Sequence, residues 1–107
     1  MNYELILYID TSESRKVTVK LGGAGMVKQL TIQKENQTGS QALLPVIVEI
    51  LKKAKKDFSS LTEIEVNAGP GSYTGLRVGI AVANALGFVL DIPVNGKKGK
   101  IVLPIYE

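Results

Sequence analysis

The pattern of hydrophobic and polar residues changes period several times along the chain, and each period predicts a different element. Residues 3–9 form a nearly continuous apolar run, which is typical of a strand buried on both faces. Residues 15–21 and 26–34 show strand-like patterns on either side of a glycine cluster, which predicts a β-hairpin. Across residues 40–58 apolar side chains recur at helical spacing, and Pro45 either kinks this helix or marks its first turn.

The second half of the chain alternates between strand and helix patterns. Residues 61–69 predict a strand, residues 74–90 a helix, residues 91–96 a short strand and residues 100–107 an extended end segment. The complete order predicts an α/β domain with a mixed sheet, an antiparallel hairpin and two crossover helices. This is the topology of the ribonuclease H-like fold and of a single lobe of the actin-like ATPases. The length of 107 residues fits one domain, residues 1–107.

Composition excludes several kinds of chemistry. The chain has no cysteine and no histidine, so disulfides, thiol catalysis and the usual general base are excluded. The net charge of +3 comes mainly from lysines in residues 52–56 and 96–100. Such lysines are usually solvated surface, and RNA binding is the alternative, although no aromatic residues are interleaved with them. Because no segment approaches the roughly 20 apolar residues of a membrane span, we expect a cytoplasmic protein without membrane contact.

A glycine-rich segment, NAGPGSYTG (residues 67–75), follows a predicted strand and opens a predicted helix. Backbone N–H groups at such a position attract anions, so the loop is a candidate phosphate site. Its glycines and hydroxyls match neither of the standard phosphate-binding patterns. The alternative is a tight turn in which Ser72 or Thr74 caps the helix.

The helix itself contains a stripe of small residues, because Gly75, Gly79, Ala83 and Gly87 recur every four residues. Interior glycine costs about 1 kcal/mol relative to alanine, and close approach of another backbone compensates for that cost. The stripe packs either against the chain's own first helix or against a second protein, and we favour the second protein. In that case Gly79→Leu or Ala83→Leu abolishes an association and leaves the fold intact. The side chains expected to hold this helix to its own sheet are Leu76, Ile80, Leu86 and Val89.

Four segments in this order resemble the TsaB family: LYIDTS (7–12), LLPVIVEIL (43–51), GPGSYTGLRVGIAVANALG (69–87) and IPVNG (92–96). The resemblance implies a non-catalytic, actin-like subunit in bacterial synthesis of threonylcarbamoyladenosine on tRNA. It also implies pairing through helices with a TsaD-like catalytic subunit that carries the metal and the chemistry, with tRNA contacted indirectly. We expect no cofactor, and we expect that the same helix also supports a homodimer. The predicted interface residues are Ser72, Tyr73, Thr74, Leu76, Arg77, Gly79, Ile80, Ala83, Asn84 and Gly87.

The resemblance has two departures. Typical members carry a second, similar lobe, so the comparison predicts a single-lobe short form in this chain. Family members also often have a histidine just before the LLP segment, where this chain reads GSQALLP.

Asp10 carries the alternative function, a minimal metal-dependent nuclease or phosphotransferase of the ribonuclease H-like type. It ends the first predicted strand, where such enzymes place a metal or phosphate ligand, and these nucleases need several converging carboxylates. The interpretation we prefer is that Asp10 accepts backbone N–H bonds in the following turn and that the chain has no catalytic residue. The nearest further carboxylates by chain position are Glu63, Glu65 and Asp91. The other candidate phosphate or metal ligands are Thr11, Ser12 and Gly71.

Overall fold

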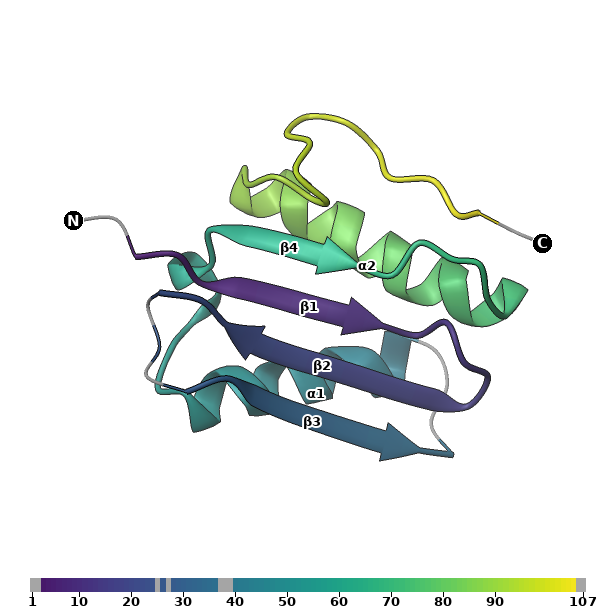
Figure 1. Cartoon of the computed structure of the whole chain (residues 1–107), viewed down its shortest axis with the longest axis horizontal. Helices are drawn as coiled ribbons and strands as arrows, with labels where there is room; N and C mark the ends of the chain where they lie inside the picture. Colours follow the sequence, from purple (N-terminus) through teal and green to yellow (C-terminus); the bar gives the residue numbers. More distant parts are fainter. Residues whose placement is uncertain (1–2, 25, 27, 37–39, 106–107) are drawn as a thin grey trace.

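A computed structural model describes residues 3–24, 26, 28–36 and 40–105, which form a four-stranded sheet and two α-helices (Figure 1). The strands lie in the order β3-β2-β1-β4. β1 pairs antiparallel with β2 and parallel with β4, and β2 pairs antiparallel with β3, so the prediction of a mixed sheet with an antiparallel hairpin is confirmed. The strand bounds are β1 (Ile6–Asp10), β2 (Lys16–Gly22), β3 (Leu30–Glu35) and β4 (Glu63–Val66).

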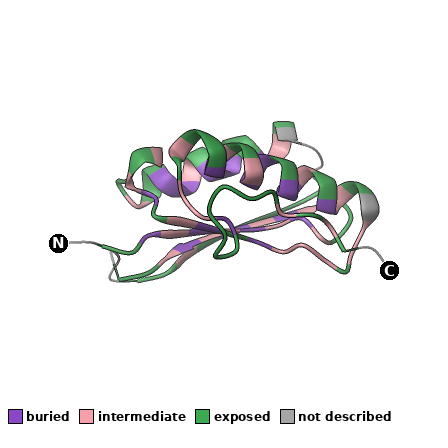
Figure 2. Ribbon diagram, turned by 90° about the horizontal axis from the view of Figure 1, so that it is seen from above, coloured by how far each residue is buried: buried purple, intermediate pink, exposed green. Residues whose placement is uncertain are grey.

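Both helices lie over the same face of the sheet (Figure 2). α1 (Ser40–Lys53) connects β3 to β4, and the 3-10 helix η1 (Phe58–Ser60) lies in that connection. α1 ends before residue 58, the predicted end, and Pro45 lies inside the helix rather than in its first turn. α2 (Tyr73–Leu90) follows β4 and leads to an isolated parallel bridge between Val94 and Ile64. Both predicted crossover helices are therefore present.

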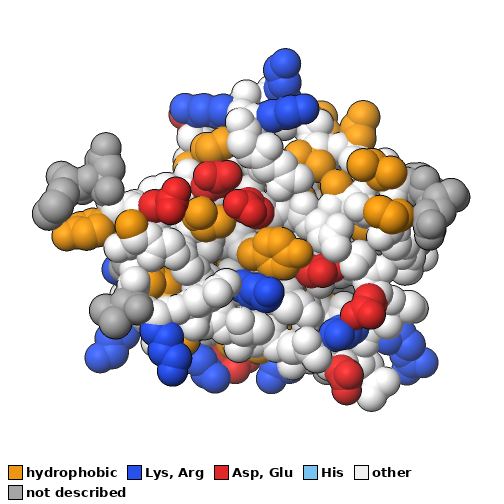
Figure 3. Space-filling view, in the orientation of Figure 1, with side chains coloured by type: hydrophobic (Ala, Val, Ile, Leu, Met, Phe, Trp, Pro, Cys, Tyr) orange, Lys and Arg blue, Asp and Glu red, His pale blue; other side chains and the backbone are white. Residues whose placement is uncertain are grey.

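In β1 and β2 buried and partly exposed side chains alternate strictly, because the helices cover one face only, whereas in the edge strand β3 only Ile32 is buried. In β1, Leu7 and Ile9 are fully buried beneath the helices, whereas Ile6, Tyr8 and Asp10 face the open side. The prediction that this first strand is buried on both faces is therefore wrong. Figure 3 views the open face, where acidic and basic side chains are interspersed over the strands.

Two predicted strands are shorter or absent. β3 begins at Leu30 rather than at residue 26, and residues 25 and 27 lie outside the described part of the chain. The predicted strand at residues 91–96 is reduced to bridges at Val94, and residues 101–105 run without regular secondary structure. No helix in the described ranges has both the length and the apolar character needed to cross a membrane.

Candidate functional site

The small-residue stripe of α2 faces the interior of this chain. Gly79, Ala83 and Gly87 are buried, and a methyl group added at Gly79 or Gly87 would overlap Thr11 or Val94, respectively. The interpretation of the stripe as a surface for a second protein is therefore wrong. The glycines of the stripe do not pack against the chain's own first helix either, because the atoms closest to them outside α2 belong to Ile9, to Thr11 and to residues 92–94.

The Thr11 hydroxyl explains why positions 75 and 79 of α2 are glycines. Thr11 is only 3% exposed, and its Oγ1 donates to the carbonyl of Gly75 at 2.6 Å and accepts from the N–H of Gly79 at 3.0 Å. These two backbone groups are the ones that pair with each other in a regular α-helix. The hydroxyl therefore lies directly against the backbone of α2, and a side chain at either glycine would displace it. Thr11 has a structural role in place of the predicted phosphate or metal contact.

Asp10, Ser12 and Asn67 form a hydrogen-bonded cluster where β1 and β4 end. Asp10 Oδ1 accepts from the Ser12 N–H at 2.9 Å and from the Ser12 hydroxyl at 2.6 Å, and Asn67 Nδ2 donates to Asp10 Oδ2 at 3.3 Å. Burial by itself raises the pKa of Asp10, but these hydrogen bonds and the Lys16 charge outweigh it and lower that pKa overall. The preferred prediction, that Asp10 accepts a backbone N–H in the turn, is confirmed.

The glycine-rich loop packs against the same turn. Ser72 donates its N–H to the Ser12 carbonyl at 2.8 Å, and a methyl group at Gly71 would lie 2.7 Å from that carbonyl oxygen. Ser72 is also the N-cap of α2, since its hydroxyl accepts from the N–H of Gly75 at 3.3 Å. Close packing against residues 11–12 and helix capping therefore account for Gly71, Ser72 and Gly75 without a phosphate.

The carboxylates named with Asp10 do not converge on it. In the β1–β4 register Glu63 lies beside Ile6, at the beginning of both strands, and Glu65 lies beside Tyr8 rather than beside Asp10. Asp91 caps the C-terminus of α2 and forms an ion pair with Lys98. Across the described ranges, no group of three acidic, histidine or cysteine side chains is placed to hold a metal ion. The arrangement therefore gives no support to a metal-dependent nuclease.

Only part of the predicted interface is exposed. Thr74 and Arg77 lie on the outside of α2, whereas Leu76 and Ile80 are 0% and 4% exposed and contact the core. Asn84 binds the chain's own C-terminal segment, because its Nδ2 donates to the Val102 carbonyl and its Oδ1 accepts from the Val102 N–H, both at 3.0 Å. The Tyr73 side chain lies outside the described part of the structure.

The two helices present an exposed surface on their side away from the sheet, which we call the outer helical face. The exposed fractions are 42% for Leu44 and 37% for Val48 on α1, and 75% for Val89 on α2. Ala81 and Ala85 of α2 are also exposed on this face, because the stripe residues are the ones turned towards the interior. Val89 was expected to contact the sheet, and that expectation is wrong. The outer helical face consists of Leu44, Pro45, Val48, Thr74, Arg77, Ala81, Ala85, Phe88 and Val89.

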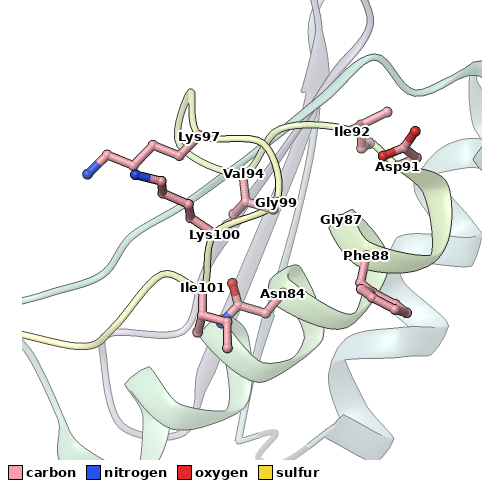
Figure 4. A pocket seen from close by; sticks show the side chains of 10 residues that line it. All are labelled: Asn84, Gly87, Phe88, Asp91, Ile92, Val94, Lys97, Gly99, Lys100 and Ile101. Carbon is pink, nitrogen blue, oxygen red and sulfur yellow. The ribbon is translucent and has the colours of Figure 1, made fainter.

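A cavity of about 280 Å³ lies between the end of α2 and the loop that follows it (Figure 4). Its floor includes Gly87 and Val94, and Phe88 and Ile101 line it as exposed apolar side chains. Lys97 and Lys100 of the predicted basic segment contribute the cationic side chains. The lining residues are Asn84, Gly87, Phe88, Asp91, Ile92, Val94, Lys97, Gly99, Lys100 and Ile101.

Sequence reasoning missed two asparagines that organise these regions. Asn95 completes the edge of β4, because its side chain accepts from the Val66 N–H at 2.8 Å and donates to the Val66 carbonyl at 3.0 Å. Asn67 joins Asp10 to Ser12. The Asn95–Gly96 pair, with positive φ at both residues, is a turn signal in the sequence, but its bond to β4 depends on tertiary structure.

The mixed sheet and its helices have the ribonuclease H-like, actin-like fold. The chain belongs to the family whose model is described as "TsaD: tRNA N6-adenosine threonylcarbamoyltransferase", which matches residues 25–96. A relative named tRNA threonylcarbamoyladenosine biosynthesis protein TsaB, from Bacillus subtilis, is 33% identical over 91 residues, covering 84% of this chain and 39% of that protein. The protein of the same name from Haemophilus influenzae is 38% identical over 58 residues, covering 54% of this chain and 25% of that protein.

A solved structure gives the same picture. The structure titled YeaZ from Pseudomonas aeruginosa matches with a TM-score of 0.77 and 32% identity, covering 85% of this chain and 42% of that chain. These matches confirm the predicted resemblance to TsaB. The chain spans less than half the length of these relatives.

Proposed function

We propose that this chain is a non-catalytic subunit in the synthesis of threonylcarbamoyladenosine on tRNA and that it docks on a TsaD-like catalytic subunit. Its relatives from two organisms carry the name of that biosynthesis. The family match at residues 25–96 includes all of α1 and α2, the helices that form the outer helical face. Because the relatives act in tRNA modification, we place the protein in the cytoplasm, where such an assembly works.

The exposed apolar residues of the outer helical face carry this proposal. Helices pack at interaxial distances of 8–10 Å, and small side chains at the contact permit the closer approach. The short side chains of Ala81 and Ala85 would let a partner helix approach α2 closely, and Leu44, Val48 and Val89 provide apolar area around them. In an isolated chain these side chains remain in water, and a partner helix laid across them removes that apolar area from water.

The hydrogen-bonded state of the Asp10 cluster supports a non-catalytic role. Both carboxylate oxygens of Asp10 already have donors within the chain, and the neighbouring Thr11 hydroxyl is bound to α2. Acyl transfer to tRNA needs groups that polarise the donor and accept a proton, and we propose that the partner subunit supplies them. This chain then contributes the docking surface.

The test is a binding measurement between the purified chain and the purified TsaD-like subunit from the same organism. Ala85→Glu places a charge at the centre of the outer helical face, and we expect it to weaken association by at least tenfold, as for a desolvated charge at an interface. Ala24→Glu is the matched control, because Ala24 is an exposed alanine in the turn before β3. Equal affinities for the wild type and both variants would contradict docking through this face.

The outer helical face also supports a homodimer when the partner is absent, since a two-fold contact uses the same patch on both copies. Sedimentation of the chain over a concentration series measures this self-association. We expect Ala85→Glu to shift the dimer to monomer, with Ala24→Glu behaving as the wild type. A wild-type chain that is monomeric throughout the series would contradict the homodimer and leave the docking test unaffected.

A further inference from the structure

The cavity at the end of α2 combines an exposed aromatic ring with cationic side chains. Phe88 is 88% exposed, the largest exposed fraction among the large hydrophobic residues of the described chain. In Figure 4, Phe88 projects from the end of α2, and Lys97 and Lys100 extend from the facing loop in the other direction. The fold gains nothing from an exposed phenyl ring, since burial of such a ring would stabilise the chain by roughly 2 kcal/mol.

The charges of the cavity are unevenly distributed. Asp91 lies at the opposite end of the cavity from Lys97 and Lys100 in Figure 4, and its carboxylate is 3.4 Å from the ammonium group of Lys98. The ion pairs of the described chain involve Lys16, Lys34, Lys53 and Lys98, so Lys97 and Lys100 are not neutralised by a carboxylate. One end of the cavity therefore carries uncompensated positive charge beside apolar walls.

We propose that this cavity binds an unpaired segment of RNA, with a base stacked on Phe88 at one side and the phosphates of a neighbouring part of the strand at Lys97 and Lys100 at the other. Proteins that bind single-stranded nucleic acid combine an aromatic platform with a cationic path for the backbone. A volume of about 280 Å³ lies just below the usual range for small-ligand sites, which suits one base-sized group. The identity of the RNA as tRNA rests on the proposed function, whereas the stacking and charge contacts do not.

The exposed aromatic residue is the observation that distinguishes this site from ordinary surface lysines. In the sequence Phe88 precedes the lysine segment by several residues and belongs to a helix, so the two show no interleaved pattern. Asp91 ends α2 with a left-handed backbone conformation, and the chain then reverses through Val94 and returns along the helix. This reversal brings Lys97, Lys100 and Ile101 to the cavity that Phe88 also lines.

The experiment measures fluorescence anisotropy of a labelled single-stranded RNA of about 12 nucleotides, a length that covers the usual site sizes. It uses the chain alone, without the TsaD-like subunit, over a series of salt concentrations. We expect Phe88→Ala to raise the Kd about tenfold and Phe88→Trp to retain binding, as base stacking requires. We expect K97Q/K100Q to reduce the slope of log K against log salt by about 1.4, or about 0.7 for each phosphate contact.

The matched control is K52Q/K56Q, which removes the same charge from exposed lysines at the end of α1. We expect its salt slope to equal that of the wild type. The proposal is overturned if the wild type does not bind the RNA at low salt, or if both lysine pairs have equal effects and Phe88→Ala has none. It is also overturned if Phe88→Ala weakens only the association with the TsaD-like subunit, since the cavity then binds protein. Phe88 lies one turn after Ala85 on the same exposed side of α2. The two proposals are therefore separated by the RNA measurement on the chain alone and by K97Q/K100Q, which changes residues outside the outer helical face.

Discussion

The contact between Thr11 and α2 makes a specific prediction about Gly79→Ala. Alanine is normally the better helix residue by about 1 kcal/mol, so this substitution in a free helix is stabilising. Here the added methyl group would overlap Thr11 Oγ1 and displace the hydroxyl from Gly75 and Gly79. The substitution therefore acts on the packing of α2 against the segment after β1.

The expected magnitude follows from three contributions. Overpacking of a buried site costs roughly 1–3 kcal/mol. Losing the two hydrogen bonds of Thr11 costs about 1 kcal/mol each, and the helix preference of alanine returns about 1 kcal/mol. The net loss of unfolding free energy is about 3 kcal/mol, and for a domain of this size it lowers the Tm by roughly 12 °C.

The assay is thermal and urea unfolding followed by circular dichroism, with Ala81→Gly as the control for helix preference alone. Ala81 is exposed on the same helix, so we expect that control to cost about 1 kcal/mol. In a Thr11→Ala background the obstructing hydroxyl is gone and the nearest remaining atom, Ile9 Cγ2, lies 3.4 Å away. Gly79→Ala should then be neutral or stabilising. A Gly79→Ala protein as stable as the wild type would refute the reasoning.

Three further substitutions test other contacts. Asp10→Asn should lower the Tm by its full amount at pH 7 and by progressively less below about pH 4. Hydrogen bonds from neighbouring residues outweigh burial and hold the pKa of Asp10 below its ordinary value, so the ionised carboxylate stabilises the fold. This stabilisation is lost as the pH falls through the pKa of the folded state, and the difference in Tm between variant and wild type over a pH series measures it. Asn84→Ala should release Val102, which limited proteolysis detects as faster cleavage near residue 100, with the Tm lowered by only a few degrees. Asn95→Ala should cost about 2 kcal/mol in urea unfolding, because Val66 loses its N–H and carbonyl partners at the edge of β4.

The original prediction for Gly79→Leu and Ala83→Leu now has the opposite outcome. Both positions are buried against the sheet, so we expect these variants to unfold rather than to remain folded without a partner. The small-residue pattern correctly indicated a close backbone contact. It did not indicate which chain makes that contact, because spacing along a helix defines a face and not the neighbour of that face.

Local patterns were sufficient for most of the secondary structure. Alternation at β2 and helical spacing at α1 and α2 predicted the elements, because each pattern reflects the contact of one face with a core. Ser72 as the helix cap and the Asp10 turn were also predicted, since each bond joins residues two or three apart. Motif resemblance led to the same family that the comparisons show.

Contacts between distant segments were decided only by the tertiary structure. Both helices cover the same face of the sheet, so β1 is buried on one side although its sequence is nearly continuously apolar. Thr11 reaches the backbone of α2, and Asn84 binds Val102, through residues far apart in the chain. Phe88 and Lys97 share a cavity because the chain reverses after α2. Sequence periodicity records whether a side chain is buried, whereas the identity of its neighbours depends on how the chain packs in three dimensions.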